Sequence, residues 1–209
     1  MFNLANIICG SPFLYLPDKL KGLVVGADKG ALKLIKKKID VDLAIGDFDS
    51  VTPLEFELIK EHAKELIVLP SIKDITDAEA AVIEIMKKGI THAILYGALG
   101  GRFDHQYGVI QLMLKYAKKG ARIEAVDACN RLLVLTPGVY ELDVNFTYVS
   151  FFALEVMVKR LYLSDVKYEL SGYNLAVDDA LCTSNEPLNK RINVSFEEGY
   201  LLVVMSSDC

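Results

Sequence analysis

The stretch that organises the chain is Leu43-Ala44-Ile45-Gly46-Asp47-Phe48-Asp49-Ser50. Its first three residues are apolar and predict the end of a buried strand, and Gly46 frees the backbone to turn. Asp47 and Asp49 follow at positions i and i+2, which places both carboxylates on one side of an extended chain. Two neighbouring carboxylates repel each other unless a cation lies between them, and Mg²⁺ prefers such hard oxygen ligands together with substrate phosphates. The alternative is a polar turn in which the aspartates only favour the loop conformation.

Apolar segments alternate with segments of helical periodicity over the first two thirds of the chain. Two helix starts carry the signature of a capping box, Thr52 with Glu55 and Thr76 with Glu79. The expected strands are residues 6–10, 22–26, 42–45, 65–69, 92–96 and 123–126, and the expected helices are 32–38, 78–88 and segments starting near 53 and 103. This alternation predicts an α/β domain, residues 1–136, with a mostly parallel sheet and flanking helices.

Polar loops follow several of these strands. In parallel sheets, ligands bind at the carboxyl ends of the strands, so side chains in these loops are expected to converge on one edge of the sheet. This convergence favours a functional acidic site over a set of unrelated polar turns. The side chains concerned are Asp28, Asp47, Asp49, Asp74, Asp77, Arg102 and Asp104.

Helical periodicity disappears after Thr136-Pro137-Gly138. Short runs of β-branched and aromatic residues, separated by turns, take its place at residues 146–154, 156–163, 192–196 and 200–205. Such runs predict an all-β sandwich or barrel. We therefore place a second domain at residues 137–209.

Composition excludes several classes of protein. A hydrophobic fraction of 52% excludes disorder, and a net charge of −5 argues against non-specific nucleic-acid binding. The N-terminus has no signal-peptide pattern, and no apolar run is long enough to span a membrane. The four cysteines lie far apart in the sequence. Their spacing supports neither a zinc site nor a disulfide framework, so we expect free thiols in a reducing cytoplasm.

The loop Gly97–His105 combines glycines, an arginine and the start of a helix. Backbone N–H groups at a helix start favour an anion, and the planar fork of Arg102 fits phosphate oxygens. The alternative is a tight turn in which Arg102 pairs with Asp104. Two further alternatives stay open: Lys73 either contacts phosphate or is solvated, and Asp77 either binds Mg²⁺ or only favours the helix start electrostatically.

The motifs also resemble those of the thiamine pyrophosphokinase family in order and spacing. Their sequences are Gly26-Ala27-Asp28-Lys29-Gly30-Ala31, Gly46-Asp47-Phe48-Asp49-Ser50, Asp74-Ile75-Thr76-Asp77 and Gly97-Ala98-Leu99-Gly100-Gly101-Arg102-Phe103-Asp104-His105. In the second domain, Thr183-Ser184-Asn185-Glu186 resembles the Ser-Asn motif of that family. The resemblance covers nearly the whole chain.

The resemblance implies transfer of pyrophosphate from ATP to thiamine, giving thiamine diphosphate and AMP, with Mg²⁺ as cofactor. It implies an ATP-binding catalytic domain, a thiamine-binding β-sandwich and a homodimer with thiamine bound between chains. Catalysis and metal binding would fall to Asp47, Asp49, Asp74 and Asp77, with Arg102 also catalytic. ATP would contact Asp28, Lys29, Gly100, Gly101, Arg102, Asp104, His105 and Asn130, and thiamine would contact Thr183, Ser184 and Asn185.

The sequence departs from the family pattern in two ways. Lys29 stands where many members have glycine, and the chain has no tryptophan to stack on thiamine. Two other functions also stay open. One is a different metal-dependent nucleotidyl- or glycosyltransferase with an Asp-x-Asp site, and the other is a non-catalytic sensor that binds thiamine or a nucleotide.

Overall fold

The protein consists of two compact units. The structure, a computed structural model, describes residues 3–209. The first unit contains the residues up to Leu112 together with Ala125–Asp127, and the second contains Met113–Glu124 together with Ala128–Cys209. The chain passes between the units within α4 (Phe103–Ala117), within β6 (Arg122–Val126) and after Asp127.

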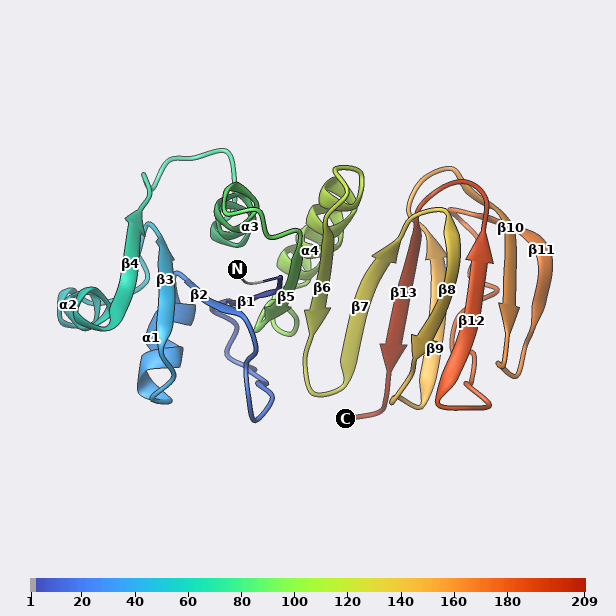
Figure 1. The fold of residues 1–209 in the computed structure, drawn as a ribbon, viewed down its shortest axis with the longest axis horizontal. Helices are drawn as coiled ribbons and strands as arrows, with labels where there is room; N and C mark the ends of the chain where they lie inside the picture. Colours follow the sequence, from blue (N-terminus) through green and yellow to red (C-terminus); the bar gives the residue numbers. More distant parts are fainter. Residues whose placement is uncertain (1–2) are drawn as a thin grey trace. The chain divides into compact units, whose positions relative to one another are not determined.

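The first unit is built on parallel strands in the order β4-β3-β2-β1-β5 (Figure 1). Each neighbouring pair among these strands is parallel. The strands are β1 (Ala5–Ile8), β2 (Leu23–Ala27), β3 (Val41–Gly46), β4 (Ala63–Val68) and β5 (His92–Tyr96). Strands β1, β2 and β5 are almost entirely apolar, as expected for a sheet covered on both faces. The predicted parallel α/β architecture is confirmed.

Helices α1 (Lys29–Lys36) and α2 (Pro53–His62) pack together against the strands. Helix α1 begins at Lys29, three residues earlier than the predicted start at residue 32. Its first turn lies close to the end of β1, because a Cβ atom on Gly30 would fall 1.8 Å from the Ile8 carbonyl oxygen. Only glycine permits this approach. Helix α3 (Asp77–Lys87) packs on β1, β2 and β3.

The predicted capping box at the start of α2 is present. The Thr52 hydroxyl accepts the backbone N–H of Glu55 at 3.3 Å, and the Glu55 carboxylate accepts the backbone N–H of Thr52 at 3.1 Å. At α3, the Thr76 hydroxyl accepts the backbone N–H of Glu79 at 3.2 Å. Helix α2 therefore starts at the predicted position, and α3 starts at Asp77, one residue before the predicted start.

The second unit is a β-sandwich of two antiparallel sheets. In one sheet, the strands of this unit have the order β7 (Asn130–Leu135), β13 (Leu201–Ser206), β9 (Tyr148–Ala153). The other has the order β11 (Leu170–Ala176), β10 (Met157–Ser164), β12 (Arg191–Phe196), β8 (Gly138–Asp143). Their inner faces share a core that includes the fully buried side chains of Phe151, Leu161 and Val194. The predicted sandwich is confirmed.

Strand β7 belongs to the second unit, whereas the sequence suggested a boundary near Pro137. Residues Asn130–Leu135 pair with Ser206–Leu201 of β13. That partner lies at the far end of the chain, so no local pattern around β7 reveals which unit it joins. Strands β8 and β11 were also not predicted, because their runs of apolar residues are short.

The expectation of four free thiols is wrong. Cys129 and Cys209 form a disulfide across 80 residues, with their Cα atoms 5.8 Å apart. The pairing of Asn130 with Ser206 brings these two positions together, and the Ser207 N–H donates to the Cys129 carbonyl oxygen at 2.9 Å. Sequence spacing carries no information about such a contact. Cys9 and Cys182 are free.

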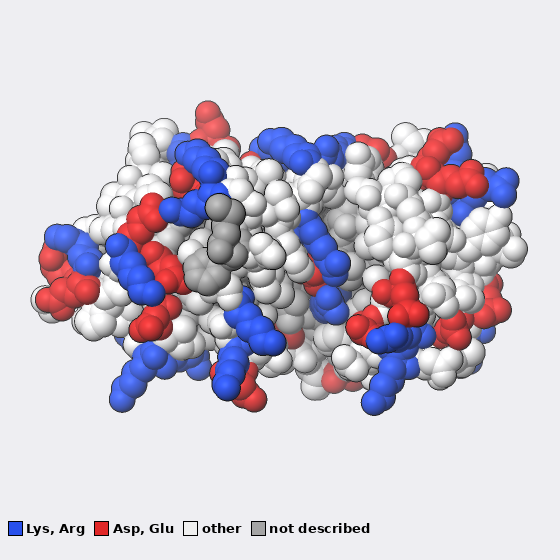
Figure 2. All heavy atoms as spheres, viewed as in Figure 1, with Lys and Arg blue, Asp and Glu red and all other residues white. Residues whose placement is uncertain are grey.

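Charged side chains of both signs are interspersed on the face shown in Figure 2. Many charged side chains of the described residues form ion pairs, such as Lys36 with Glu55 and Arg191 with Glu141. Within residues 3–209, no helix is both long and apolar enough to cross a membrane.

Candidate functional site

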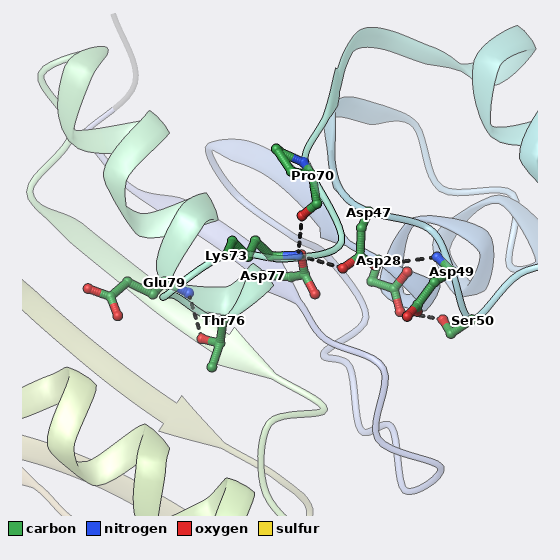
Figure 3. A network of polar contacts seen from close by, with 9 residues as sticks. All are labelled: Asp28, Asp47, Asp49, Ser50, Pro70, Lys73, Thr76, Asp77 and Glu79. Atoms are coloured by element: carbon green, nitrogen blue, oxygen red, sulfur yellow. Dashed lines mark hydrogen bonds and ion pairs between the residues drawn. The ribbon is translucent and has the colours of Figure 1, made fainter.

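Three aspartates from two neighbouring loops form a cluster at the carboxyl ends of the strands. Asp28 follows β2, and Asp47 and Asp49 follow β3; these strands are parallel neighbours in which Ala27 lies opposite Ile45. One carboxylate oxygen from each aspartate lies within 4.8 Å of the other two, a grouping that can hold a metal ion. Figure 3 shows these side chains approaching one another. The predicted convergence of polar loops therefore occurs for these residues.

Gly46 lets the two loops approach. A Cβ atom at this position would lie 3.1 Å from the Asp28 Cα and N atoms, closer than nearly all real Cβ contacts. The loops also have unusual backbone conformations, with a φ angle of 48° at Asp28 and 56° at Phe48. Left-handed conformations of this kind cost roughly 1–2 kcal/mol per residue and persist where the surrounding structure imposes them. The buried Phe48 ring, 5.3 Å from that of Phe56, anchors the turn between Asp47 and Asp49.

The Asp28 carboxylate is held but only partly satisfied. Asp28 occupies the N-cap position of α1, yet its side chain makes no capping hydrogen bond. Its Oδ2 atom instead accepts a hydrogen bond from the Ser50 hydroxyl. Its Oδ1 atom is buried and has no hydrogen-bond partner within residues 3–209. A buried oxygen without a partner is costly unless a ligand satisfies it, and three carboxylates suit Mg²⁺. The residues therefore fit this ion.

Lys73 connects the cluster to α3. Its Nζ atom lies 2.6 Å from Asp47 Oδ2 and 3.1 Å from Asp77 Oδ1, and it donates to the Pro70 carbonyl oxygen at 3.4 Å (Figure 3). The lysine is therefore not simply solvated, and its side chain is 14% exposed. The hydrogen bond from Lys73 lowers the pKa of Asp47, whereas burial raises the pKa of Asp77. Asp77 is thus linked to the cluster through Lys73, which pairs with both Asp77 and Asp47.

Asp74 has a different position from the other predicted metal ligands. Its side chain is exposed and is not part of the Asp28, Asp47 and Asp49 group in the described chain. Asp28, which the resemblance assigned to ATP, occupies that group instead. The aspartates grouped in the structure therefore differ from the set of metal ligands that the resemblance implied.

The glycine-rich loop after β5 carries an ion pair. Two nitrogen atoms of Arg102 bind Asp104, with Nε 3.1 Å from Oδ1, and the His105 N–H donates to the same Oδ1 at 2.9 Å. The pair is exposed, and Arg102 holds the pKa of Asp104 at about 2. Gly100 and Gly101 have φ angles of 77° and 90° that favour glycine. Arg102 and Asp104 therefore pair in the way that the alternative interpretation of this loop described.

Lys33 was not singled out in the sequence, although it helps to build the adjoining loop. Its Nζ atom donates to the carbonyl oxygens of Gly10, at 3.0 Å, and Ser11. The Ser11 hydroxyl in turn donates to the Leu99 carbonyl oxygen at 3.0 Å. Lys29, the predicted phosphate contact, is exposed at the first position of α1. A lysine that binds backbone carbonyls leaves no sequence pattern, which explains why Lys33 was missed.

In the second unit, the side chain of Asn185 is turned inward. Its Oδ1 atom accepts the backbone N–H groups of Tyr168 and Glu186, both at 3.0 Å, and its Nδ2 atom donates to the Tyr168 carbonyl oxygen at 2.8 Å. Asn185 is 3% exposed, whereas Thr183 and Ser184 are exposed. Asn130, the remaining predicted contact, starts β7 opposite Ser206. The Ser-Asn motif thus combines an accessible hydroxyl with an internal amide.

The fold and the acidic cluster define a class of two-unit proteins. In this class, a parallel α/β unit presents candidate cation ligands at its carboxyl edge, and a β-sandwich contributes a second unit. Comparison with known proteins identifies the family. Residues 19–125 match the model described as "Thiamin pyrophosphokinase, catalytic domain", and residues 139–201 match "Thiamin pyrophosphokinase, vitamin B1 binding domain". The chain belongs to the thiamin pyrophosphokinase family.

Relatives support this assignment along the whole chain. A curated thiamine pyrophosphokinase of Bacillus subtilis is 35% identical over 97% of this chain and 98% of its own length. A crystal structure of thiamine pyrophosphokinase from Bacillus subtilis, 33% identical in sequence, has a TM-score of 0.90 and covers 99% of this chain and 100% of that chain. A thiamin pyrophosphokinase family protein of Enterococcus faecalis, 27% identical, also has a TM-score of 0.90 and covers 98% of this chain and 99% of that chain.

Proposed function

We propose that this protein transfers a pyrophosphoryl group from ATP to the hydroxyl group of thiamine, giving thiamine diphosphate and AMP. The observation that carries this proposal is the cluster of Asp28, Asp47 and Asp49, in which the Asp28 Oδ1 atom is buried and has no hydrogen-bond partner within the described residues. The cluster lies at the edge of the sheet where α/β proteins bind their ligands. The match to the catalytic-domain model, residues 19–125, includes all three aspartates.

We propose that Asp28, Asp47 and Asp49 hold Mg²⁺, with Asp74 and Asp77 as predicted further ligands, directly or through water. When bound, Mg²⁺ neutralises charge on the phosphate oxygens. We assign the exposed side chains of Lys29, Arg102 and His105, together with Gly100 and Gly101, to the phosphates of ATP. Asp104 takes two of the five donors of the Arg102 guanidinium, which has others to offer to phosphate.

The chemical step is an in-line displacement. The thiamine oxygen forms a bond to the β-phosphorus, the bond from that phosphorus to the α,β-bridging oxygen breaks, and AMP leaves with the bridging electron pair. The hydroxyl proton passes to an acidic side chain late in the step. Positioning and charge neutralisation supply most of the rate in such reactions. Arg102 contributes by stabilising the negative charge on the transferred group.

For thiamine, we propose contacts from Thr183 and Ser184, because both are exposed while the Asn185 amide is committed to the backbone. The predicted homodimer, with thiamine between chains, and a nucleotide contact from Asn130 are part of the proposal. A cytoplasmic location also remains a prediction. The Cys129–Cys209 disulfide removes the argument for it that rested on free thiols.

The direct test is incubation with ATP, Mg²⁺ and thiamine, followed by separation of the nucleotides and thiamine esters. We expect AMP and thiamine diphosphate in equal amounts. Formation of ADP would rule out pyrophosphoryl transfer. Binding of both ligands without turnover would favour a sensor, and nucleotide turnover that thiamine does not stimulate would favour another transferase. Asp49→Asn should raise the Mg²⁺ concentration needed for half-maximal rate, and an unchanged Mg²⁺ requirement would exclude Asp49 as a ligand.

A further inference from the structure

Lys73 is held by carboxylates from two separate elements. Asp47 lies in the loop after β3, and Asp77 is the first residue of α3. Both point at the same ammonium group, with N···O distances of 2.6 Å and 3.1 Å (Figure 3). Lys73 therefore ties the loop that carries two of the clustered aspartates to the start of α3.

This arrangement differs from an ordinary surface ion pair. The side chains of Lys73 and Asp47 are 14% and 11% exposed. By contrast, the side chain of Lys64, which pairs with Asp42 near the start of β3, is 67% exposed. Exposed pairs contribute little, because water and salt screen them. The charge of Lys73 acts in a more enclosed place, where electrostatic interactions are stronger.

Asp47 is shared between Lys73 and the cation cluster. Its Oδ1 atom accepts the Asp49 N–H at 3.3 Å, and its Oδ2 atom accepts a hydrogen bond from Lys73. The same carboxylate belongs to the group that can hold a metal ion. A divalent cation there must share Asp47 with the ammonium group and must bind close to a second positive charge. Both effects oppose binding of the cation by itself.

Lys73 should favour binding of a polyphosphate, whereas it opposes binding of a divalent cation. The cluster presents several negative charges, which repel an anion, and the Lys73 ammonium offsets part of that charge. We propose that Lys73 is a positioning residue that weakens binding of the divalent cation alone and strengthens binding of the nucleotide. The site then favours cation and nucleotide together over either ligand by itself. This inference rests on the proposed function for the identity of its two ligands.

The test measures Mn²⁺ binding to the purified full chain, using the electron paramagnetic resonance signal of free Mn²⁺. Lys73→Met removes the charge and keeps most of the side-chain volume. We expect this variant to bind Mn²⁺ roughly tenfold more tightly than the wild type, since a charge within a few ångströms of the ion is removed. Lys73→Arg keeps the charge and should stay within about twofold of the wild type. Lys64→Met, a matched loss of a paired lysine, should leave Mn²⁺ affinity unchanged.

The second measurement is ATP affinity at saturating Mn²⁺, by calorimetry. We expect Lys73→Met to bind ATP roughly tenfold more weakly, so that the two affinities move in opposite directions. If Lys73 had only a structural role, Lys73→Met would bind both Mn²⁺ and ATP more weakly, and that result would overturn the inference. Unchanged or weaker Mn²⁺ binding in Lys73→Met would also overturn it, as would a lack of measurable Mn²⁺ binding in both proteins.

The inference about Lys73 and the proposed reaction can fail independently, and the measurements distinguish the two failures. If the wild type forms AMP while Lys73→Met binds Mn²⁺ as the wild type does, only the inference about Lys73 fails. If the wild type forms no AMP but Lys73→Met gains Mn²⁺ affinity, the competition for Asp47 stands and the proposed reaction fails. Failure of the wild type to bind ATP would contradict the proposed reaction and the nucleotide half of the inference.

Discussion

The Ser50 hydroxyl donates a hydrogen bond to Oδ2 of Asp28, joining the loop after β3 to the loop after β2. This bond fixes the rotation of a carboxylate whose other oxygen is buried and has no hydrogen-bond partner within residues 3–209. Groups in this position orient metal ligands, and their loss typically costs about 10- to 100-fold in metal affinity.

Ser50→Ala should therefore raise the Mg²⁺ concentration for half-maximal activity by roughly tenfold. The melting temperature should fall only slightly, because one partly exposed side-chain bond is lost. Ser71→Ala, a change at an exposed serine in the next polar loop, provides the matched control and should alter neither quantity. An unchanged Mg²⁺ requirement in Ser50→Ala would contradict the role of Asp28 as a ligand.

Asn185 should be required mainly for stability. Asn185→Ala leaves two backbone N–H groups and one carbonyl oxygen without their partner in the second unit. We expect a loss of about 2–4 kcal/mol in the free energy of unfolding, measured by urea denaturation. Ser184→Ala should keep the stability of the wild type and raise the KM for thiamine. If the stability of Asn185→Ala were unchanged, the inward orientation of the amide would be wrong.

The disulfide should be visible in thiol counts. The unfolded, unreduced protein should react at two thiols, those of Cys9 and Cys182, and the reduced protein at all four. In the native state both reactions should be slow, because burial raises the pKa of Cys9 to about 12 and that of Cys182 to about 11. Four reactive thiols in the unreduced protein would exclude the bond.

Removing the disulfide should destabilise the second unit. Closing a loop of 80 residues is worth about 4.5 kcal/mol in the chain-entropy model. Cys209→Ser should therefore unfold at a lower urea concentration than the oxidised wild type. Addition of a reductant should bring the wild type down to the stability of the variant and leave the variant itself unaffected.

The capping box of α2 should respond to acid. Hydrogen bonds from the Thr52 backbone and from Lys36 lower the pKa of Glu55 from 4.5 to about 2. A depressed folded-state pKa gives stability that is present above pH 4.5 and is lost as the pH falls towards 2. The difference in unfolding free energy between the wild type and Glu55→Gln should therefore shrink over that interval.

Thr52→Ala separates this pH effect from capping itself. The variant loses the hydroxyl that accepts the Glu55 N–H, so it should be destabilised by about 1 kcal/mol at every pH. It keeps the backbone N–H that binds the Glu55 carboxylate, and with it the acid response. If the free energies of unfolding of the wild type and Glu55→Gln differed by the same amount at all pH values, the lowered pKa assigned to Glu55 would be wrong.

Patterns within a few residues predicted the elements of the first unit well. Thr52 and Glu55 specify the start of α2 through atoms three positions apart, and both hydrogen bonds are present. The apolar run before Gly46 specifies β3 and the turn after it. Strand β7 and the Cys129–Cys209 bond escaped prediction, because each depends on a partner at the other end of the chain.

The sequence by itself determined the alternation of strands and helices, and with it the edge of the sheet at which the acidic loops meet. The tertiary structure alone decided which aspartates share a site. Asp28 joins Asp47 and Asp49 because β2 and β3 pair in parallel and because Gly46 has no side chain to hold the loops apart. Asp74 stays outside the cluster, and Lys73 takes the place beside Asp47. Such contacts depend on strand pairing and close packing, which no local pattern encodes.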